Sequence, residues 1–179
     1  FSSNVNPLTL SVDVKKVIVN NVKNISRYPD SESLEFKLAL GKHLKVSSKN
    51  IIVGNGSTEL IYQIAYAFKP KVALTVSPTF SEYEKALLNV GAKIKYLRLK
   101  EKNKFNISIK EIIGRMDGID MVFLCNPNNP TGKIINRDEL IFLLKKFKSR
   151  KIILVLDEAF IDLVEENSLI DLALNNNLF

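Results

Sequence analysis

Apolar residues recur along this chain in two patterns that alternate from one segment to the next. Apolar side chains three and four positions apart are typical of helices with one buried face, whereas short continuous apolar runs are typical of strands buried on both faces. Proline or glycine closes several segments, as Pro78 and Gly91 do. The pattern predicts helices at 12–22, 33–44, 57–68, 80–90, 108–115, 137–147 and 168–174, and strands at 51–53, 71–77, 93–99, 121–125 and 152–156.

Strands that alternate with helices indicate an α/β fold, with a mostly parallel sheet covered by helices on both faces. We expect residues 1–45 to form an N-terminal segment with helices, and residues 46–179 to form a larger domain. Residues 175–179 are typical of a turn that leads into another strand. The larger domain is therefore expected to be incomplete in this chain.

Polar clusters follow four of the expected strands. They are Gly54-Asn55-Gly56, Pro78-Thr79-Phe80, the run Asn126–Gly132, and Asp157-Glu158. Ligands of parallel α/β sheets bind outside the carboxyl ends of the strands. The four clusters are therefore expected to converge on one site.

Charge and composition exclude several classes of protein. The chain has a net charge of +7, but its lysines are spread along the sequence without a basic stripe interleaved with aromatic residues, so nucleic-acid binding is not expected. No apolar run approaches the roughly 20 residues of a membrane span, and no secretory leader is visible, so the cytoplasm is the expected location. The single Cys125 cannot form an internal disulfide, and with the single His43 it offers no metal site.

The segment from Gly54 to Glu59 has the features of a phosphate-binding helix start. Glycines let the backbone approach a ligand closely, and the free N–H groups of a helix start favour an anion. Glu59 stands where a dinucleotide-binding motif needs its third glycine, so a nicotinamide cofactor is disfavoured. An ordinary helix with Ser57 or Thr58 as its N-cap, after a tight turn, explains the same residues, and this alternative stays open.

The run Asn126–Gly132, Asn-Pro-Asn-Asn-Pro-Thr-Gly, is a rigid turn after an apolar strand, and Asp157-Glu158-Ala159-Phe160 follows the next strand. Together these motifs resemble the class I/II aminotransferases of pyridoxal phosphate (PLP) fold type I. The segments 2–8, 27–30, 54–59 and 78–83 are similar to the group that holds histidinol-phosphate aminotransferase and threonine-phosphate decarboxylase. The resemblance covers essentially the whole chain and implies PLP as the cofactor.

The resemblance implies three contacts with the PLP ring. The carboxylate of Asp157 is expected to pair with the protonated pyridine nitrogen, because an opposite charge nearby favours the cationic ring. Asn129 is expected to form a hydrogen bond with the phenolic oxygen, and Phe80 to stack on the ring face. An exposed turn acid at Asp157 and a core phenylalanine at Phe80 are the structural alternatives.

The resemblance also implies contacts beyond the ring. Gly56, Ser57 and Thr58 are expected to hold the phosphate, and Asn6 to line the substrate pocket. Tyr28 is expected to reach the phosphate of the cofactor bound to a neighbouring subunit. This last role implies a homodimer with shared active sites.

Two departures from the family pattern affect the expected activity. Phe160 stands where many members have a tyrosine, and it cannot donate a hydrogen bond to the cofactor, a feature that favours the decarboxylase branch. The last lysine, Lys151, precedes Asp157, so the Schiff-base lysine expected later in the fold is absent. We expect a PLP-dependent enzyme that transaminates or decarboxylates a small phosphorylated amino substrate. A binding module without catalytic activity is the alternative.

Overall fold

The computed structural model describes residues 4–5 and 8–175, in two compact units formed by residues 1–36 and 37–179. Each unit is described by itself. The predicted domain boundary between residues 45 and 46 stays a prediction.

The first unit contains helix α1, Val12–Asn21, followed by a short 3₁₀ turn, Val22–Asn24. The hydroxyl of Ser11 caps α1 by accepting a hydrogen bond from the backbone N–H of Val14 at 3.3 Å. None of the residues of α1 is buried. Helix α2, Leu34–Leu44, runs from the end of the first unit into the second. Both helices were expected from the apolar spacing.

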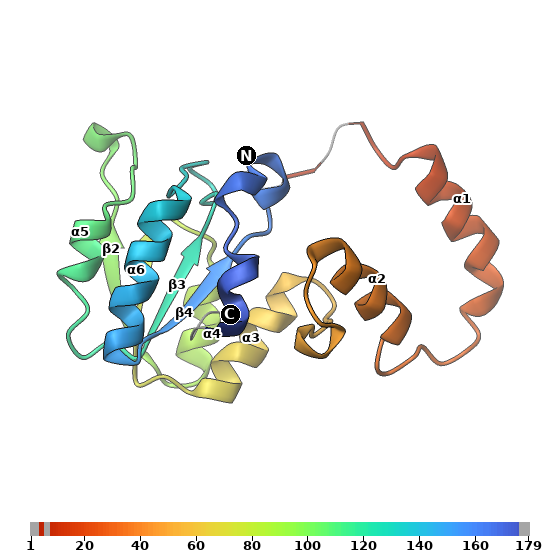
Figure 1. The fold of residues 1–179 in the computed structure, drawn as a ribbon, viewed down its shortest axis with the longest axis horizontal. Coiled ribbons are helices and arrows are strands. Elements are labelled where there is room, and N and C mark those ends of the chain that lie inside the picture. Colours follow the sequence, from red (N-terminus) through yellow and green to blue (C-terminus); the bar gives the residue numbers. More distant parts are fainter. Residues whose placement is uncertain (1–3, 6–7, 176–179) are drawn as a thin grey trace. The chain divides into compact units, whose positions relative to one another are not determined.

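The second unit is built around a sheet of four parallel strands (Figure 1). The strands are β1 (Val72–Ser77), β2 (Lys93–Arg98), β3 (Met121–Cys125) and β4 (Ile153–Asp157), in the order β2-β1-β3-β4. The predicted α/β fold with a parallel sheet is confirmed.

Helices pack on both faces of the sheet, as predicted. Helices α3 (Ser57–Phe68) and α4 (Glu82–Asn89) contribute buried residues to the core on one face. Helices α5 (Ile109–Ile113) and α6 (Arg137–Arg150) contribute to the core on the other face. The strands serve both cores because successive side chains point to opposite faces, so Phe123 of β3 joins the first core and Leu124 joins the second.

Two local predictions were wrong, and a third is confirmed with different bounds. Residues 51–53 are not a strand, and Ile52 and Val53 are exposed, so this apolar run lacks the strand partner it would need. The last helix is a 3₁₀ helix, Ile170–Asn175, which follows the 3₁₀ turns Ile161–Leu163 and Glu165–Asn167. The N-cap of α3 is Gly56 rather than Ser57 or Thr58. The turn expected at the chain end falls largely on residues 176–179, outside the described residues.

The remaining described elements are two 3₁₀ turns, Ser48–Asn50 and Glu101–Asn103.

The chain changes direction across the sheet between β1 and β3. From β1 it passes to β2 on one side, and it returns across β1 to β3 and then β4 on the other side. At such a switch point the loops after neighbouring strands diverge, and a crevice forms at the edge where the strands end. We call this edge the carboxyl edge.

Asn128 ties together the loops that follow β1 and β3. Its buried side chain donates hydrogen bonds to the carbonyl oxygen of Pro78 at 3.1 Å and to the hydroxyl of Thr131 at 2.8 Å. The hydroxyl of Thr79 donates to its Oδ1 atom at 2.7 Å. The side chain therefore braces the switch point with three hydrogen bonds.

Asn126 braces the same turn from the other side. Its buried amide donates to the carbonyl oxygen of Ile135 at 3.1 Å, and its Oδ1 accepts from the N–H of Ile135 at 2.8 Å. With these two hydrogen bonds the Asn126 side chain pairs with the backbone of Ile135 as a neighbouring strand would, and it holds the residues that follow the turn in place.

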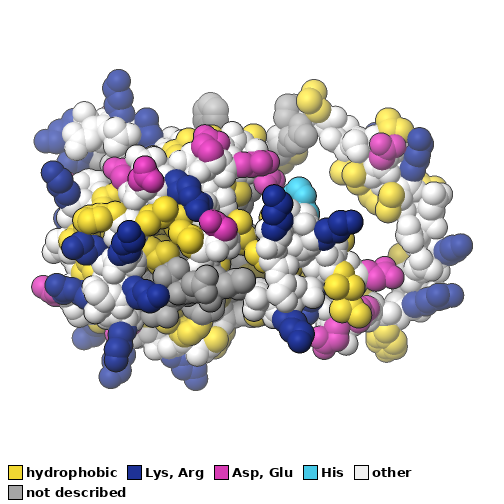
Figure 2. Space-filling view, viewed as in Figure 1, with side chains coloured by type: hydrophobic (Ala, Val, Ile, Leu, Met, Phe, Trp, Pro, Cys, Tyr) yellow, Lys and Arg dark blue, Asp and Glu magenta, His cyan; other side chains and the backbone are white. Residues whose placement is uncertain are grey.

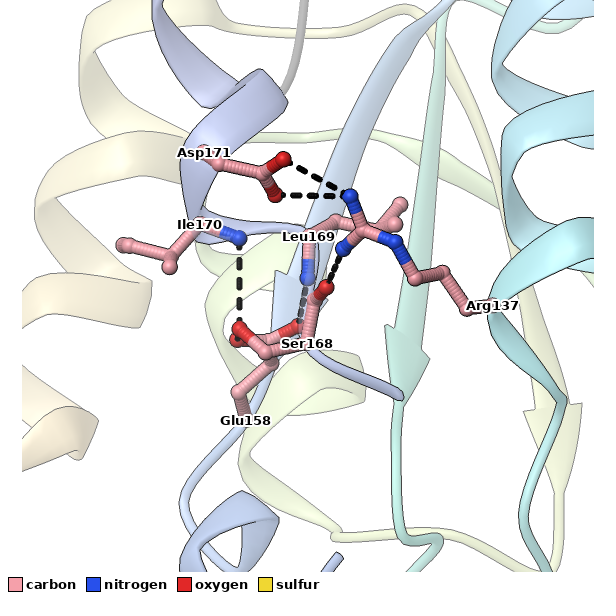
Figure 3. A network of polar contacts seen from close by, with 6 residues as sticks. All are labelled: Arg137, Glu158, Ser168, Leu169, Ile170 and Asp171. Atoms are coloured by element: carbon pink, nitrogen blue, oxygen red, sulfur yellow. Dashed lines mark hydrogen bonds and ion pairs between the residues drawn. The ribbon is translucent and has the colours of Figure 1, made fainter. Parts of the chain in front are cut away.

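The carboxylate of Glu158 holds the segment after β4 (Figure 3). Its two oxygens accept hydrogen bonds from the hydroxyl of Ser168 at 2.7 Å and from the N–H of Leu169 at 2.8 Å. Arg137 donates to the carbonyl oxygen of Ser168 and binds both carboxylate oxygens of Asp171, at 2.7 and 3.0 Å. We call these five residues the Glu158 clasp.

Burial raises the pKa of the Glu158 carboxyl, although the hydrogen bonds from Leu169 and Ser168 and the charge of Arg137 oppose the shift. The folded protein therefore holds this proton at a pH where the unfolded chain has released it. The resulting stabilisation is complete below the pKa of the unfolded chain and is lost as the pH rises through the raised pKa.

We expect Asn128→Ala to lower the free energy of unfolding by about 2–4 kcal/mol, because three hydrogen bonds are lost and buried partners stay unpaired. Denaturant titration of the complete protein measures the change. Asn103→Ala, at an exposed asparagine, is the matched control. A change in Asn128→Ala no larger than in this control would contradict the bracing role.

We expect Glu158→Gln to gain stability relative to the wild type as the pH rises, because glutamine keeps a neutral side chain in the clasp at every pH. Denaturant titrations at several values between about pH 4 and pH 8 give the difference. Glu165→Gln removes the same charge from an exposed position nearby and serves as the control. A difference for Glu158→Gln that stays constant with pH would contradict the raised pKa of the Glu158 carboxyl.

Candidate functional site

The loops after three strands meet at the carboxyl edge of the sheet. They begin at Pro78 after β1, at Asn126 after β3 and at Glu158 after β4. The register of β3 and β4 sets Cys125 opposite Asp157, and the N–H of Asn126 donates to the carbonyl oxygen of Asp157 at 2.8 Å. The asparagine-rich turn and the last residue of β4 are thus neighbours, as the sequence predicted.

The start of α3 lies at the same edge. This helix has 12 residues and β1 has 6, so both are close to 20 Å long, and residues 69–71 reverse the chain between them. The beginning of α3 therefore lies level with the end of β1. A direct contact agrees with this, because the hydroxyl of Tyr62 in α3 donates to Glu82, at the start of α4, at 3.3 Å.

The first turn of α3 presents free backbone N–H groups to solvent. Its N-cap, Gly56, has a φ of +83° and offers no side chain to accept from them, and a Cβ at this position would meet no atom within 4 Å. Ser57 and Thr58 are exposed. The Glu59 carboxylate accepts from the N–H of Asn55 at 2.6 Å. The helix start is therefore open to an anion.

The carboxylate of Asp157 is partly buried and has two hydrogen-bond donors. The N–H of Ala159 donates to Oδ1 at 2.9 Å, and the hydroxyl of Tyr83 donates to Oδ2 at 2.6 Å. Burial strongly raises the pKa of Tyr83, and the charge of Asp157 raises it further, so this hydroxyl stays protonated. Asp157 is therefore a fixed acid rather than a freely exposed turn residue.

Sequence reasoning did not assign a role to Tyr83. The signal available was its position three residues after Phe80, which is about one helical turn. The structure sets the ring of Phe80 edge-on to that of Tyr83, with centroids 5.7 Å apart, and Tyr83 stacks on Phe123 at 5.3 Å. Phe80 itself is partly buried, so part of its surface remains exposed.

The other predicted site residues are placed as follows. Asn129 is partly buried and follows the bracing Asn128 in the turn. Phe160 is partly buried three residues after Asp157. Tyr28 lies in the first unit and is fully exposed within it, while Asn6 lies outside the described residues. The roles of all these residues stay predictions.

Within the described residues, no group of three or more His, Cys, Asp or Glu side chains could hold a metal ion. Over the same residues, no helix combines the length and the apolar character that crossing a bilayer requires. Cys125 is buried. On the face shown in Figure 2, Lys and Arg side chains are scattered rather than gathered into a stripe.

Sequence comparison matches residues 1–176 to the family described as aminotransferase class I and II. The chain is 38% identical over 177 residues to a threonine-phosphate decarboxylase of Salmonella typhimurium, covering 99% of this chain and 49% of that protein. It is 39% identical over 165 residues to a histidinol-phosphate aminotransferase of Pelagibacter ubique, covering 90% and 45%.

Solved structures with the same fold include the histidinol-phosphate aminotransferase of Clostridium acetobutylicum, with a TM-score of 0.86 and 30% identity over 99% of this chain and 53% of that one. The L-threonine-O-3-phosphate decarboxylase of Porphyromonas gingivalis matches with a TM-score of 0.71 and 31% identity, over 83% and 43%. The chain spans about half the length of the curated relatives it matches. From the match over nearly all its residues, the chain belongs to the aminotransferase class I and II family.

Proposed function

We propose that the complete protein is a PLP-dependent enzyme that transaminates or decarboxylates a small phosphorylated amino substrate. One observation carries the proposal: a fixed carboxylate, Asp157, shares the carboxyl edge of the sheet with an uncapped helix start at Gly56. The names of the relatives support the choice of substrate, because both enzymes act on phosphorylated amino compounds.

The residues at this edge fit the cofactor. The open first turn of α3, with Gly56, Ser57 and Thr58, suits a phosphate, because backbone N–H groups and the helix dipole both favour an anion. The partly open ring of Phe80 suits a flat heterocycle. The carboxylate of Asp157 suits a protonated pyridine nitrogen. When bound, PLP supplies an electron-withdrawing ring that stabilises negative charge at the α-carbon of the substrate.

Each residue has a separate task in the proposed reaction. Asp157 keeps a proton on the pyridine nitrogen, since its negative charge favours the cationic form. Asn129 donates a hydrogen bond to the phenolic oxygen, and Phe160 adds no second donor there because its ring has no hydroxyl. Phe80 limits the tilt of the ring and excludes water from its face.

The proposed assembly is a homodimer in the cytoplasm, with Tyr28 of each subunit reaching the phosphate bound by the other. The full exposure of Tyr28 within its own unit supports this, because a large aromatic side chain without packing there is available to a partner. Asn6 is proposed to line the substrate pocket.

We expect the complete protein to bind PLP, to turn yellow, and to lose the colour on borohydride reduction while the cofactor stays covalently attached. Supplied with threonine phosphate, or with histidinol phosphate and a 2-oxo acid, it should release carbon dioxide or form a keto product. Absorption spectra and product analysis check both steps. A protein that stays colourless with excess PLP would exclude the enzyme and favour a binding module.

We expect Asp157→Ala to lower kcat by about 10²–10³-fold, the usual cost of losing one preorganised electrostatic group. Steady-state kinetics at saturating PLP measure the change, and thermal unfolding shows whether the fold is kept. Asp162→Ala, at an exposed acid nearby, is the matched control and should leave kcat within about twofold. Equal kcat values for the two variants would remove the proposed role of Asp157.

A further inference from the structure

The orientation of the Asp157 carboxylate depends on hydrogen bonds. Among the described residues no ion pair involves Asp157. Its Oδ1 contact with the N–H of Ala159 is local to the turn and follows from the backbone there. Its Oδ2 contact with the hydroxyl of Tyr83 joins residues 74 positions apart, from a different element of the fold. The long-range contact is therefore what ties the carboxylate to the rest of the core.

The ring of Tyr83 is held rigidly before it meets Asp157. The residue is 0% exposed and lies between two other rings, stacked on Phe123 and edge-on to Phe80. The packing of the ring therefore holds the Tyr83 hydroxyl at a fixed position. The donor is preorganised, so little conformational entropy is lost when the hydrogen bond forms.

The protonation state of the Tyr83 hydroxyl is also fixed. Burial, followed by the charge of Asp157, raises the pKa of Tyr83, so the hydroxyl can act only as a neutral donor toward the carboxylate. The neighbouring Cys125 is kept as a thiol, because burial and then the same charge raise its pKa.

We propose that Tyr83 is a positioning residue for PLP binding, which aims the charged carboxylate of Asp157 at the pyridine nitrogen through its 2.6 Å hydrogen bond. This role rests on the proposed function. It also links two proposed contacts of the cofactor, since Phe80 lies just before α4, Tyr83 lies in its first turn, and their rings are in contact. One short segment then sets both the plane of the pyridine ring and the direction of its charge partner.

The test is a double-mutant cycle in the complete protein, with the dissociation constant of PLP measured by spectroscopic titration of the apoprotein. Tyr83→Phe keeps the ring and its packing, and water can replace the hydroxyl at the partly buried carboxylate, so the fold is retained; thermal unfolding checks this. We expect Tyr83→Phe to weaken PLP binding about tenfold, in line with a hydrogen bond to a charged group.

In the Asp157→Ala background, Tyr83→Phe should change the dissociation constant by less than about twofold, because the hydroxyl has lost the group through which it acts. Tyr62→Phe is the matched control. It removes the hydroxyl–carboxylate contact between α3 and Glu82 and should leave PLP binding unchanged.

The outcomes separate the two proposals. Wild-type protein that does not bind PLP overturns the proposed function and, with it, the role of Tyr83. Wild-type protein that binds PLP, combined with unchanged binding in Tyr83→Phe, overturns the positioning role alone. Equal losses from Tyr83→Phe with and without Asp157 also overturn it, since they show a general effect on packing.

Discussion

The parallel pairing of β3 with β4 is the constraint on which the candidate site depends. It sets Cys125 opposite Asp157, and the chain continues the pairing with a hydrogen bond from the N–H of Asn126 to the carbonyl oxygen of Asp157. The rigid turn and the acidic residue are therefore held side by side by backbone bonds, whatever their side chains contact. A shift of one residue would turn the carboxylate to the opposite face of the sheet.

Successive side chains along a strand point to opposite faces of the sheet, and this gives two consecutive acids different roles. Asp157 ends β4 on the side of α4, where Tyr83 reaches it, whereas Glu158 turns the other way and closes the clasp with Ser168 and Arg137. One carboxylate is available to a ligand and the other anchors the chain that follows. Asn128 joins the loops after β1 and β3, so the carboxyl edge is braced beside the Asp157 strand as well as in the segment that follows it.

Membership of the aminotransferase class I and II family agrees with this frame, because the matched residues run through every strand of the sheet. The described residues include a helix start open to an anion, an aromatic ring and a fixed carboxylate, which suit the proposed cofactor. Their proposed contribution to the reaction is the binding and electrostatic tuning of the cofactor.

The sequence by itself determined the strands β1, β3 and β4 and the helices between them, because burial on two faces or on one leaves a local pattern of apolar residues. It also determined which polar clusters follow the strands, since parallel strands share one carboxyl edge. Only the tertiary structure decided that Tyr83 contacts Asp157, that Asn128 braces the switch point, and that residues 51–53 form no strand. These outcomes depend on partners far away in the chain, and a contact made across 74 residues leaves no periodic signal in the sequence.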